Sequence, residues 1–169
     1  MLKVTKFGGS SLASAEQFKK VADIVLADKS RRYVVPSAPG KRFKEDTKVT
    51  DMLYTCYYET LKSGEISPVF EQIKERYNSI IEGLGLDLSL EREFKIIEGS
   101  FLARAGKDYA ASRGEYLNGI IMAKYLGFDF IDAAEVIFFK ENGTFDSEIT
   151  NEVLGERLKK SEYAVIPGF

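Results

Sequence analysis

The apolar pattern changes its period twice within the first 36 residues, and this change constrains the fold more than any other feature. Residues 2–7 alternate like a short buried strand that runs into two adjacent glycines. Helical spacing follows, and Ser14 with Gln17 three residues later forms a capping-box start signal. Residues 33–35 predict a second buried strand, which Pro36 ends. Strand, helix and strand at this spacing predict a right-handed βαβ unit with parallel strands.

Further along, residues 50–126 show four stretches of helical spacing that turn signals separate. They begin near Thr50, at Ser67-Pro68, at Ser89 and near Asp108, and the last is expected to stop at Gly127. Then come two β-like runs at 128–131 and 136–139, a polar helix at about 150–160, and an apolar strand at 163–166. Buried strands alternating with amphipathic helices predict an α/β fold: a three-layer α/β/α sandwich with a mostly parallel central sheet.

Between the second strand and the first of these helices lies a strongly charged segment, residues 41–48. We expect it to be the most mobile internal loop, because its charges cannot be buried and it has little apolar anchor apart from Phe43.

Composition narrows the chemistry. A chain of 169 residues suits one domain, and its net charge of −2 suggests neither a nucleic acid nor a membrane partner. Histidine is absent, which removes Ser/His and Cys/His dyads and every histidine-based metal site, so no metal ligand is assigned. The single cysteine, Cys56, cannot form an internal disulfide and favours the cytoplasm. The N-terminus carries no apolar run long enough for a signal peptide or a membrane span.

The glycine pair is the first candidate site. Glycines after a strand allow positive φ and a close approach of ligand to backbone, and successive amides there can bind an anion. Lys6, Gly8, Gly9, Ser10 and Ser11 could therefore form a phosphate cradle, to which Lys6 would add a charge. A plain strand-to-helix turn with a solvated lysine would explain these residues about equally well. The order of residues excludes a P-loop and a GxGxxG dinucleotide fingerprint.

Four motifs in one order resemble the aspartate kinases, which are members of the amino acid kinase family. They are KFGGSS at 6–11, Val34-Val35 leading into Ser37-Ala38 with Gly40 nearby, Ser112-Arg113-Gly114-Glu115 followed by Leu117, and Val165-Ile166-Pro167-Gly168-Phe169. The resemblance extends over the full length of the chain.

The resemblance implies an ATP-dependent kinase that phosphorylates the side-chain carboxylate of L-aspartate, the first step towards lysine, threonine and methionine. It implies ATP as cofactor, with Mg²⁺ bound through the ATP phosphates. Lys6 would be catalytic and, with Gly8, Gly9 and Ser10, would contact the phosphates. Ser37, Thr50, Glu115, Gly168 and Phe169 would bind substrate, with Glu115 pairing with the α-ammonium. Phosphoryl transfer needs positioning and charge more than covalent help, so a site without histidine is adequate.

Each of these residues also has an ordinary structural interpretation. Glu115 could open a helix, where an acid is favourable against the dipole. Ser37 could stabilise the turn between two prolines, and Thr50 could cap the helix that follows it. Phe169 could belong to the core.

The same resemblance implies an organisation larger than this chain. Residues 1–169 are expected to be the N-terminal, amino-acid-binding part of one kinase catalytic domain, with the nucleotide half beyond Phe169, so this part alone would be inactive. The full-length protein is expected to be a homo-oligomer. Two alternatives stay open: another amino acid kinase, acting on acetylglutamate, glutamate or a nucleoside monophosphate, and a non-catalytic regulatory module. KFGGSS together with SRGE disfavours the other kinases.

Overall fold

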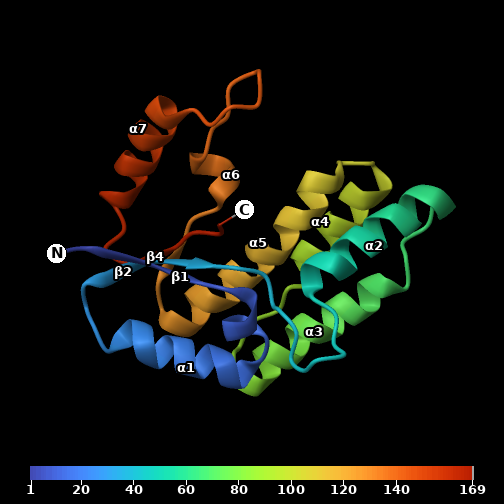
Figure 1. Ribbon diagram of the computed structural model, residues 1–169, viewed down its shortest axis with the longest axis horizontal. Coiled ribbons are helices and arrows are strands. Elements are labelled where there is room, and N and C mark those ends of the chain that lie inside the picture. The colour runs from blue at the N-terminus through green and yellow to red at the C-terminus, as the bar shows by residue number, and fades with distance from the viewer. Residues whose placement is uncertain (169) are drawn as a thin grey trace.

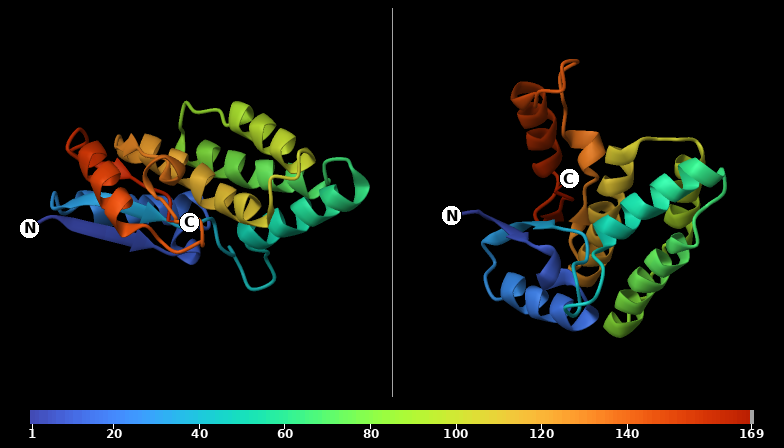
Figure 2. Two further views of the ribbon diagram at one scale, coloured as in Figure 1. Left: turned by 90° about the horizontal axis from the view of Figure 1, so that it is seen from above. Right: turned by 45° about the vertical axis from the view of Figure 1, so that its right-hand side comes forward.

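The computed structural model describes residues 1–168 and contains a parallel four-stranded sheet of order β1-β2-β4-β3 (Figure 1). Helices lie on both faces of this sheet: Figure 2 shows α7 and α1 on opposite sides of the strands. The predicted three-layer α/β sandwich with a parallel sheet is confirmed. The strands are β1 (Lys3–Phe7), β2 (Arg31–Pro36), β3 (Asp129–Phe130) and β4 (Ala164–Val165).

The helices divide into three groups. On one face of the sheet lie α1 (Ala15–Leu26) and α5 (Lys107–Leu126), and on the other lie α6 (Ala133–Val136) and α7 (Ser147–Leu158). The third group packs together beside the sheet (Figure 1): α2 (Val49–Ser63), α3 (Val69–Leu84) and α4 (Glu91–Leu102). A 3₁₀ helix, η1 (Gly9–Leu12), joins β1 to α1. Within residues 1–168, no helix is both long and apolar enough to span a membrane.

Local sequence signals set the ends of the helices that frame the site. The Ser14 hydroxyl accepts a hydrogen bond from the Gln17 amide at the start of α1, as the capping box predicts. At the end of α5, Gly127 adopts the left-handed conformation with φ 70°, and its amide donates to the Ala123 carbonyl. Both predicted boundaries are confirmed.

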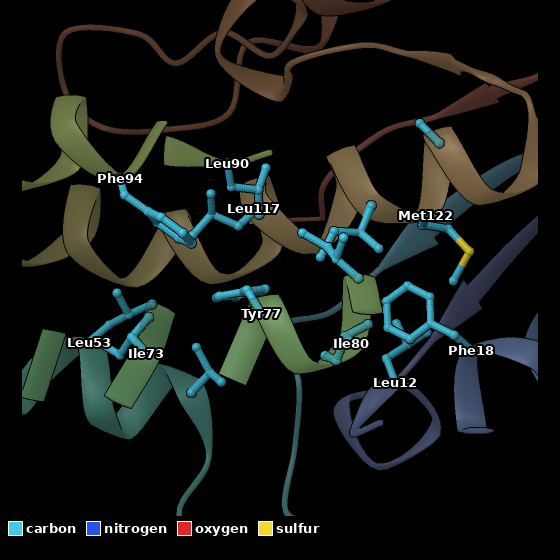
Figure 3. Close-up of a cluster of buried hydrophobic side chains, with 14 of the residues drawn as sticks. Leu12, Phe18, Leu53, Ile73, Tyr77, Ile80, Leu90, Phe94, Leu117 and Met122 are labelled. Carbon is cyan, nitrogen blue, oxygen red and sulfur yellow. The ribbon is translucent and has the colours of Figure 1, made fainter. Parts of the chain in front are cut away.

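Two hydrophobic clusters lie on the two faces of the sheet because side chains alternate along β2. Val34 is fully buried in the large cluster under α1 and α5, whereas Tyr33 packs against the small cluster under α6 and α7. Figure 3 shows the large cluster, in which side chains from η1 and α1 through α5 meet, among them Leu12, Phe18, Tyr77, Phe94 and Leu117.

The long helix α5 runs through this large cluster and approaches the loop after β2 closely at one point. A Cβ on Gly114 would lie 2.7 Å from the Ala38 Cβ and 3.3 Å from a methyl of Leu53. The absence of a side chain at Gly114 therefore lets α5 bring its next residue, Glu115, against the end of the sheet.

Two sequence predictions about strands are wrong. Residues 136–139 do not form a strand: α6 ends at Val136, and Phe139 makes only an isolated antiparallel bridge with Phe145. The Asp132 carboxylate accepts the Ala134 amide and so starts a helical turn there. The strand β1 is not buried, since it lies at an edge of the sheet with β2 as its one partner, and Val4 is 62% exposed.

Candidate functional site

Three loops meet at the carboxyl ends of β1 and β2, where ligands of parallel sheets bind. We call them the glycine loop (residues 8–12), the serine loop (residues 37–40) and the charged loop (residues 41–48). With α5 and the start of α2 they enclose a cavity of about 430 Å³, the Glu115 cavity. Its lining is Gly9, Ser10, Ser37, Ala38, Pro39, Gly40, Lys41, Lys48, Thr50 and Glu115. Five residues predicted for the site therefore share one cavity, from segments more than a hundred positions apart.

The glycine loop forms without the positive φ that its sequence suggested. Gly8 has φ −78°, and the positive-φ residues in the described chain lie elsewhere. The loop turns instead through η1, in which the Ser11 amide donates to the Gly8 carbonyl at 3.0 Å. A Cβ on Gly8 would meet no atom within 4 Å, so neither backbone conformation nor packing requires glycine at that position.

Gly9 is required by packing. Gly9 lies against the serine loop, and a Cβ on Gly9 would lie 2.8 Å from the Ala38 carbonyl oxygen. The Gly40 amide donates to the Gly9 carbonyl at 2.8 Å, and the Ser37 amide donates to the Phe7 carbonyl at 3.0 Å. The two loops are thus joined backbone to backbone, which fixes one wall of the Glu115 cavity.

Glu115 provides the negative charge of the cavity. Its Oε1 accepts the Ala38 amide at 3.2 Å, while its Oε2 is buried without a hydrogen-bond partner. Burial raises the pKa of the Glu115 carboxyl, and the Ala38 amide and the charge of Lys6 act in the opposite direction. A buried carboxylate oxygen beside an open cavity, without a donor of its own, is suited to bind a cationic group.

The helix-start interpretation of Glu115 is wrong. Glu115 lies eight residues after Lys107, the first residue of α5, so it is two turns inside the helix and beyond the reach of the N-terminal dipole. Thr50 is not a cap either, because α2 begins at Val49 with Lys48 at its N-cap. Thr50 instead lies in the first turn of α2 and lines the cavity.

Lys6 lies at the rim rather than in the lining. It is an exposed residue near the carboxyl end of β1, and its charge is close enough to lower the pKa of Glu115. Ser10 is exposed as well, on the glycine loop. This placement leaves the ammonium of Lys6 free to contact a group that enters above the Glu115 cavity.

The structure does not bring Gly168 into this cavity. Gly168 lines a separate, mostly apolar cavity of about 510 Å³ between the sheet and α6–α7, which we call the apolar groove. Its lining also includes Val4, Tyr33, Arg113 and Leu158. Phe169, the other residue predicted at this boundary, lies outside the described residues.

The sequence did not point to several residues that support the cavity. Asn118 is fully buried, and its side-chain amide donates to the Ser37 carbonyl at 2.7 Å. The Tyr77 hydroxyl donates to the Gly114 carbonyl at 2.8 Å, just before Glu115. The sequence offered only weak signals for these residues: Asn118 is a polar residue three positions after Glu115, and Tyr77 carries a hydroxyl on an apolar helix face.

One expectation for the charged loop is wrong. The Asp46 side chain is only 9% exposed, because it forms ion pairs with Arg42 and with the buried Arg76 of α3, each at 2.8 Å. These partners hold the pKa of the Asp46 carboxyl well below its usual range, the Arg42 hydrogen bond most strongly. The premise that the charges of this loop stay in solvent is therefore wrong for Asp46, whose carboxylate lies in an ion pair.

The described residues do not form a protein-based metal site. Over residues 1–168, no group of three or more histidine, cysteine, aspartate or glutamate side chains is placed to hold a metal ion.

Comparison with known proteins gives one family. The sequence profile of the amino acid kinase family matches residues 1–169. Aspartokinase 3 of Bacillus subtilis is 38% identical over 186 residues, which cover 99% of this chain and 40% of that protein. The crystal structure of Clostridium acetobutylicum aspartate kinase matches with a TM-score of 0.95 at 48% identity, covering 99% of this chain and 39% of that one.

A more distant structure has the same fold. E. coli aspartokinase III, solved in complex with aspartate and ADP, matches with a TM-score of 0.76 at 22% identity and covers all of this chain and 41% of its own. The chain spans about two fifths of the length of each of these relatives.

Proposed function

The chain belongs to the amino acid kinase family, and we propose that the full-length protein is an aspartate kinase, which transfers the γ-phosphoryl group of ATP to the side-chain carboxylate of L-aspartate. In this reaction a carboxylate oxygen of aspartate forms a bond to the γ-phosphorus while the bond to the bridging oxygen breaks, giving 4-phospho-L-aspartate and ADP. Residues 1–169 are the amino-acid-binding part of its catalytic domain.

The observation that carries this proposal is the unpartnered Oε2 of Glu115. A buried carboxylate with a raised pKa gains a strong charge-assisted hydrogen bond when an ammonium enters the cavity. The α-ammonium of aspartate supplies that group, with Ser37 and Thr50 lining the space for the rest of the molecule. The same contact would orient the side-chain carboxylate away from Glu115, towards the rim where Lys6 lies.

The rim residues suit a phosphate. Lys6 would neutralise charge on the transferring group. The glycine loop would offer its backbone at Gly8, where the space that a Cβ would occupy is open. Gly9 and Ser10 complete the phosphate-binding loop. We assign Mg²⁺ to the ATP phosphates, as the resemblance to the aspartate kinases implies.

The remaining parts of the proposal concern the whole protein. We place the nucleotide site mainly outside residues 1–169, with Gly168 and Phe169 at its boundary with the substrate. The product would enter lysine, threonine and methionine synthesis in the cytoplasm, and the enzyme would be a homo-oligomer. The aspartate and ADP bound to the E. coli relative support the choice of ligands.

The test is acyl-phosphate trapping with hydroxylamine on the full-length protein, with L-aspartate, N-acetyl-L-aspartate, succinate, L-glutamate and N-acetyl-L-glutamate. L-Aspartate alone should give hydroxamate, because succinate and the two N-acetylated acids lack the free ammonium that Glu115 binds, and L-glutamate carries its side-chain carboxylate one methylene further from that ammonium. Glu115→Gln should lose about 10²-fold in kcat/KM for aspartate, as expected when a buried charge pair loses one partner.

Other outcomes would redirect the assignment. Phosphorylation of an N-acetylated acid in preference to aspartate would identify another amino acid kinase and contradict the role of Glu115. If the protein consumes no ATP with any of the five acids, the result would favour a non-catalytic module.

A further inference from the structure

Arg76 stands out among the residues around the Glu115 cavity because it does not line the cavity and yet contacts the serine loop, the charged loop and the residue that follows the glycine loop. Its side chain, on α3, is 3% exposed. Arginine is rarely buried to this extent, and a buried guanidinium needs compensating partners. The identity of those partners indicates what the residue does.

The guanidinium joins three chain segments. One terminal nitrogen, Nη1, donates to Asp46 Oδ2 of the charged loop at 2.8 Å. The other, Nη2, donates to the Gly40 carbonyl of the serine loop and to the Ala13 carbonyl, which follows the glycine loop, the latter at 3.4 Å. Only the planar fork of arginine presents donors to acceptors in such different directions.

Two of the three acceptors are connected directly to elements that carry residues of the proposed site. The Gly40 amide donates to the Gly9 carbonyl, and the Gly40 carbonyl accepts from Arg76. Gly40 is therefore held on one side by Gly9 and on the other by Arg76. Asp46 precedes α2, whose first turn carries Thr50. The Nε of Arg76 is buried without a hydrogen-bond partner within residues 1–168, so the guanidinium bonds to these loops at the expense of one of its own donors.

We propose that Arg76 is a positioning residue that fixes the glycine, serine and charged loops relative to one another, and so sets the distance between the phosphate-binding rim and Glu115. This inference rests on the proposed kinase function. Its physical basis is that transfer between two bound groups depends steeply on their separation, so a loop displaced by about 1 Å can cost about 10²-fold in rate.

Arg42 offers a matched control. It pairs with the same Asp46 carboxylate, at 2.8 Å, but its side chain is 44% exposed and its hydrogen bonds all go to Asp46. Removing Arg42 takes a cation from Asp46 without releasing either loop carbonyl. The difference between the two variants therefore isolates the contacts to Ala13 and Gly40.

The experiment compares Arg76→Met, Arg76→Lys and Arg42→Met in the full-length protein by kcat, KM for aspartate and thermal melting. Arg76→Met should lower kcat/KM about 10²-fold. Arg76→Lys should recover part of the loss, because an ammonium can reach one or two of the acceptors but not all three. Arg42→Met should stay within about threefold of wild type, as for most exposed ion pairs.

Amide hydrogen exchange gives a readout that does not depend on activity. In Arg76→Met the amides of Gly40 and Val49, which bond to Gly9 and Pro39, should exchange faster, while that of Ile121 in the centre of α5 should not. Arg42→Met should leave all three unchanged.

Three results would overturn the proposal. One is turnover of Arg76→Met within threefold of wild type. The second is exchange that rises equally at Gly40 and Ile121, which would make Arg76 a residue of general stability. The third is full recovery by Arg76→Lys. If wild-type protein phosphorylates no amino acid, the proposed function fails, and the exchange measurements alone still decide whether Arg76 positions the loops.

Discussion

The Glu115 cavity and the apolar groove have similar volumes but are built in different ways. One wall of the Glu115 cavity is backbone: the glycine and serine loops touch through Gly9 and Gly40, and Leu12 anchors the glycine loop in the large hydrophobic cluster. The walls of the apolar groove are side chains of the sheet and of α6–α7, supported by the small cluster. Backbone walls joined by hydrogen bonds can hold a fixed shape, whereas side-chain walls adapt to what they contact.

The chemistry of the two cavities differs accordingly. The Glu115 cavity has a buried acceptor without a donor and three lysines at or near its edge, namely Lys6, Lys41 and Lys48. The groove contains one guanidinium, that of Arg113, which stacks between the rings of Tyr109 and Tyr116 at 4.6 and 4.5 Å. We therefore expect the charged residues of the first cavity to contribute to catalysis, and the apolar side chains of the groove to contribute through packing alone.

Lys6→Ala should have the largest effect. The loss of one preorganised charge contact to a transferring phosphoryl group typically costs about 10²–10³ in kcat, or about 3–4 kcal/mol of barrier. Lys6→Arg should not restore turnover, because a planar guanidinium fills the space of the phosphate differently from a compact ammonium. Measurement of kcat for aspartate phosphorylation beside a thermal melt checks both variants.

Lys3 on the same strand is the control. It is exposed and pairs with Asp28 at 2.7 Å, so Lys3→Ala should keep turnover within about twofold to threefold, as for other surface ion pairs. If Lys6→Ala behaves like Lys3→Ala, the lysine is an ordinary charge at a strand end and the phosphate site loses its main residue.

The next expected effect is on stability: truncating a leucine should lower the free energy of unfolding more in the large cluster than in the small one. Leu117 of α5 is fully buried in the large cluster, so Leu117→Ala should destabilise the protein by about 2–5 kcal/mol. Leu158 of α7 packs only partly buried against the small cluster, so Leu158→Ala should cost about 1 kcal/mol or less. Denaturant unfolding of both variants measures the difference, and equal losses would contradict the idea that the site side of the sheet carries the main core.

The adjacent glycines provide a smaller and more local test. Gly9→Ala must displace the serine loop, because its Cβ would lie 2.8 Å from a backbone oxygen, and should cost about 1–3 kcal/mol of stability. Gly8→Ala meets no atom within 4 Å and should melt near wild type, while KM for ATP rises if phosphate passes over that position. Melting curves and KM values that are alike for the two variants would show that the glycines do not have separate roles.

The elements that sequence predicted well are those set by local chemistry. The Ser14 cap, the Gly127 stop and the strand at 33–35 each depend on residues within a few positions, and each is present. The strand predicted at 136–139 failed because its apolar run fits several conformations, and the Asp132 cap decided among them. The exposure of β1 could not be read from its sequence, since it depends on which strands become neighbours.

The site divides in the same manner. Lys6, Gly9, Ser37 and Glu115 were identified through motifs that resemble a known family, and the structure then placed the last three around one cavity. Arg76 and Asn118 were missed, because single polar residues within helical stretches carry no local signal. Their contacts span 36 residues to Gly40 and 81 to Ser37, distances over which only the fold brings residues together.

The contribution of Glu115 to the pH dependence of stability should be the smallest effect. Because burial raises the pKa of its carboxyl above 4.5, the folded protein retains a proton that the unfolded chain has lost over the pH range between the two pKa values. The free energy of unfolding of the unliganded protein should therefore fall as pH rises through that range, by at most about 1.4 kcal/mol per pH unit. Aspartate binding should change in the opposite sense, since an ammonium prefers the carboxylate, so KM should fall as pH rises.

Glu115→Gln separates this contribution from those of the other acids. The variant keeps an acceptor for the Ala38 amide but cannot titrate, so its unfolding free energy should lack the decrease that wild type shows above pH 4.5. Denaturant unfolding at half-unit pH steps on both proteins measures the difference. Parallel curves for wild type and Glu115→Gln would mean that the Glu115 carboxyl has the same pKa in the folded and unfolded states. Glu115 would then bind an ammonium no more strongly than an exposed carboxylate does.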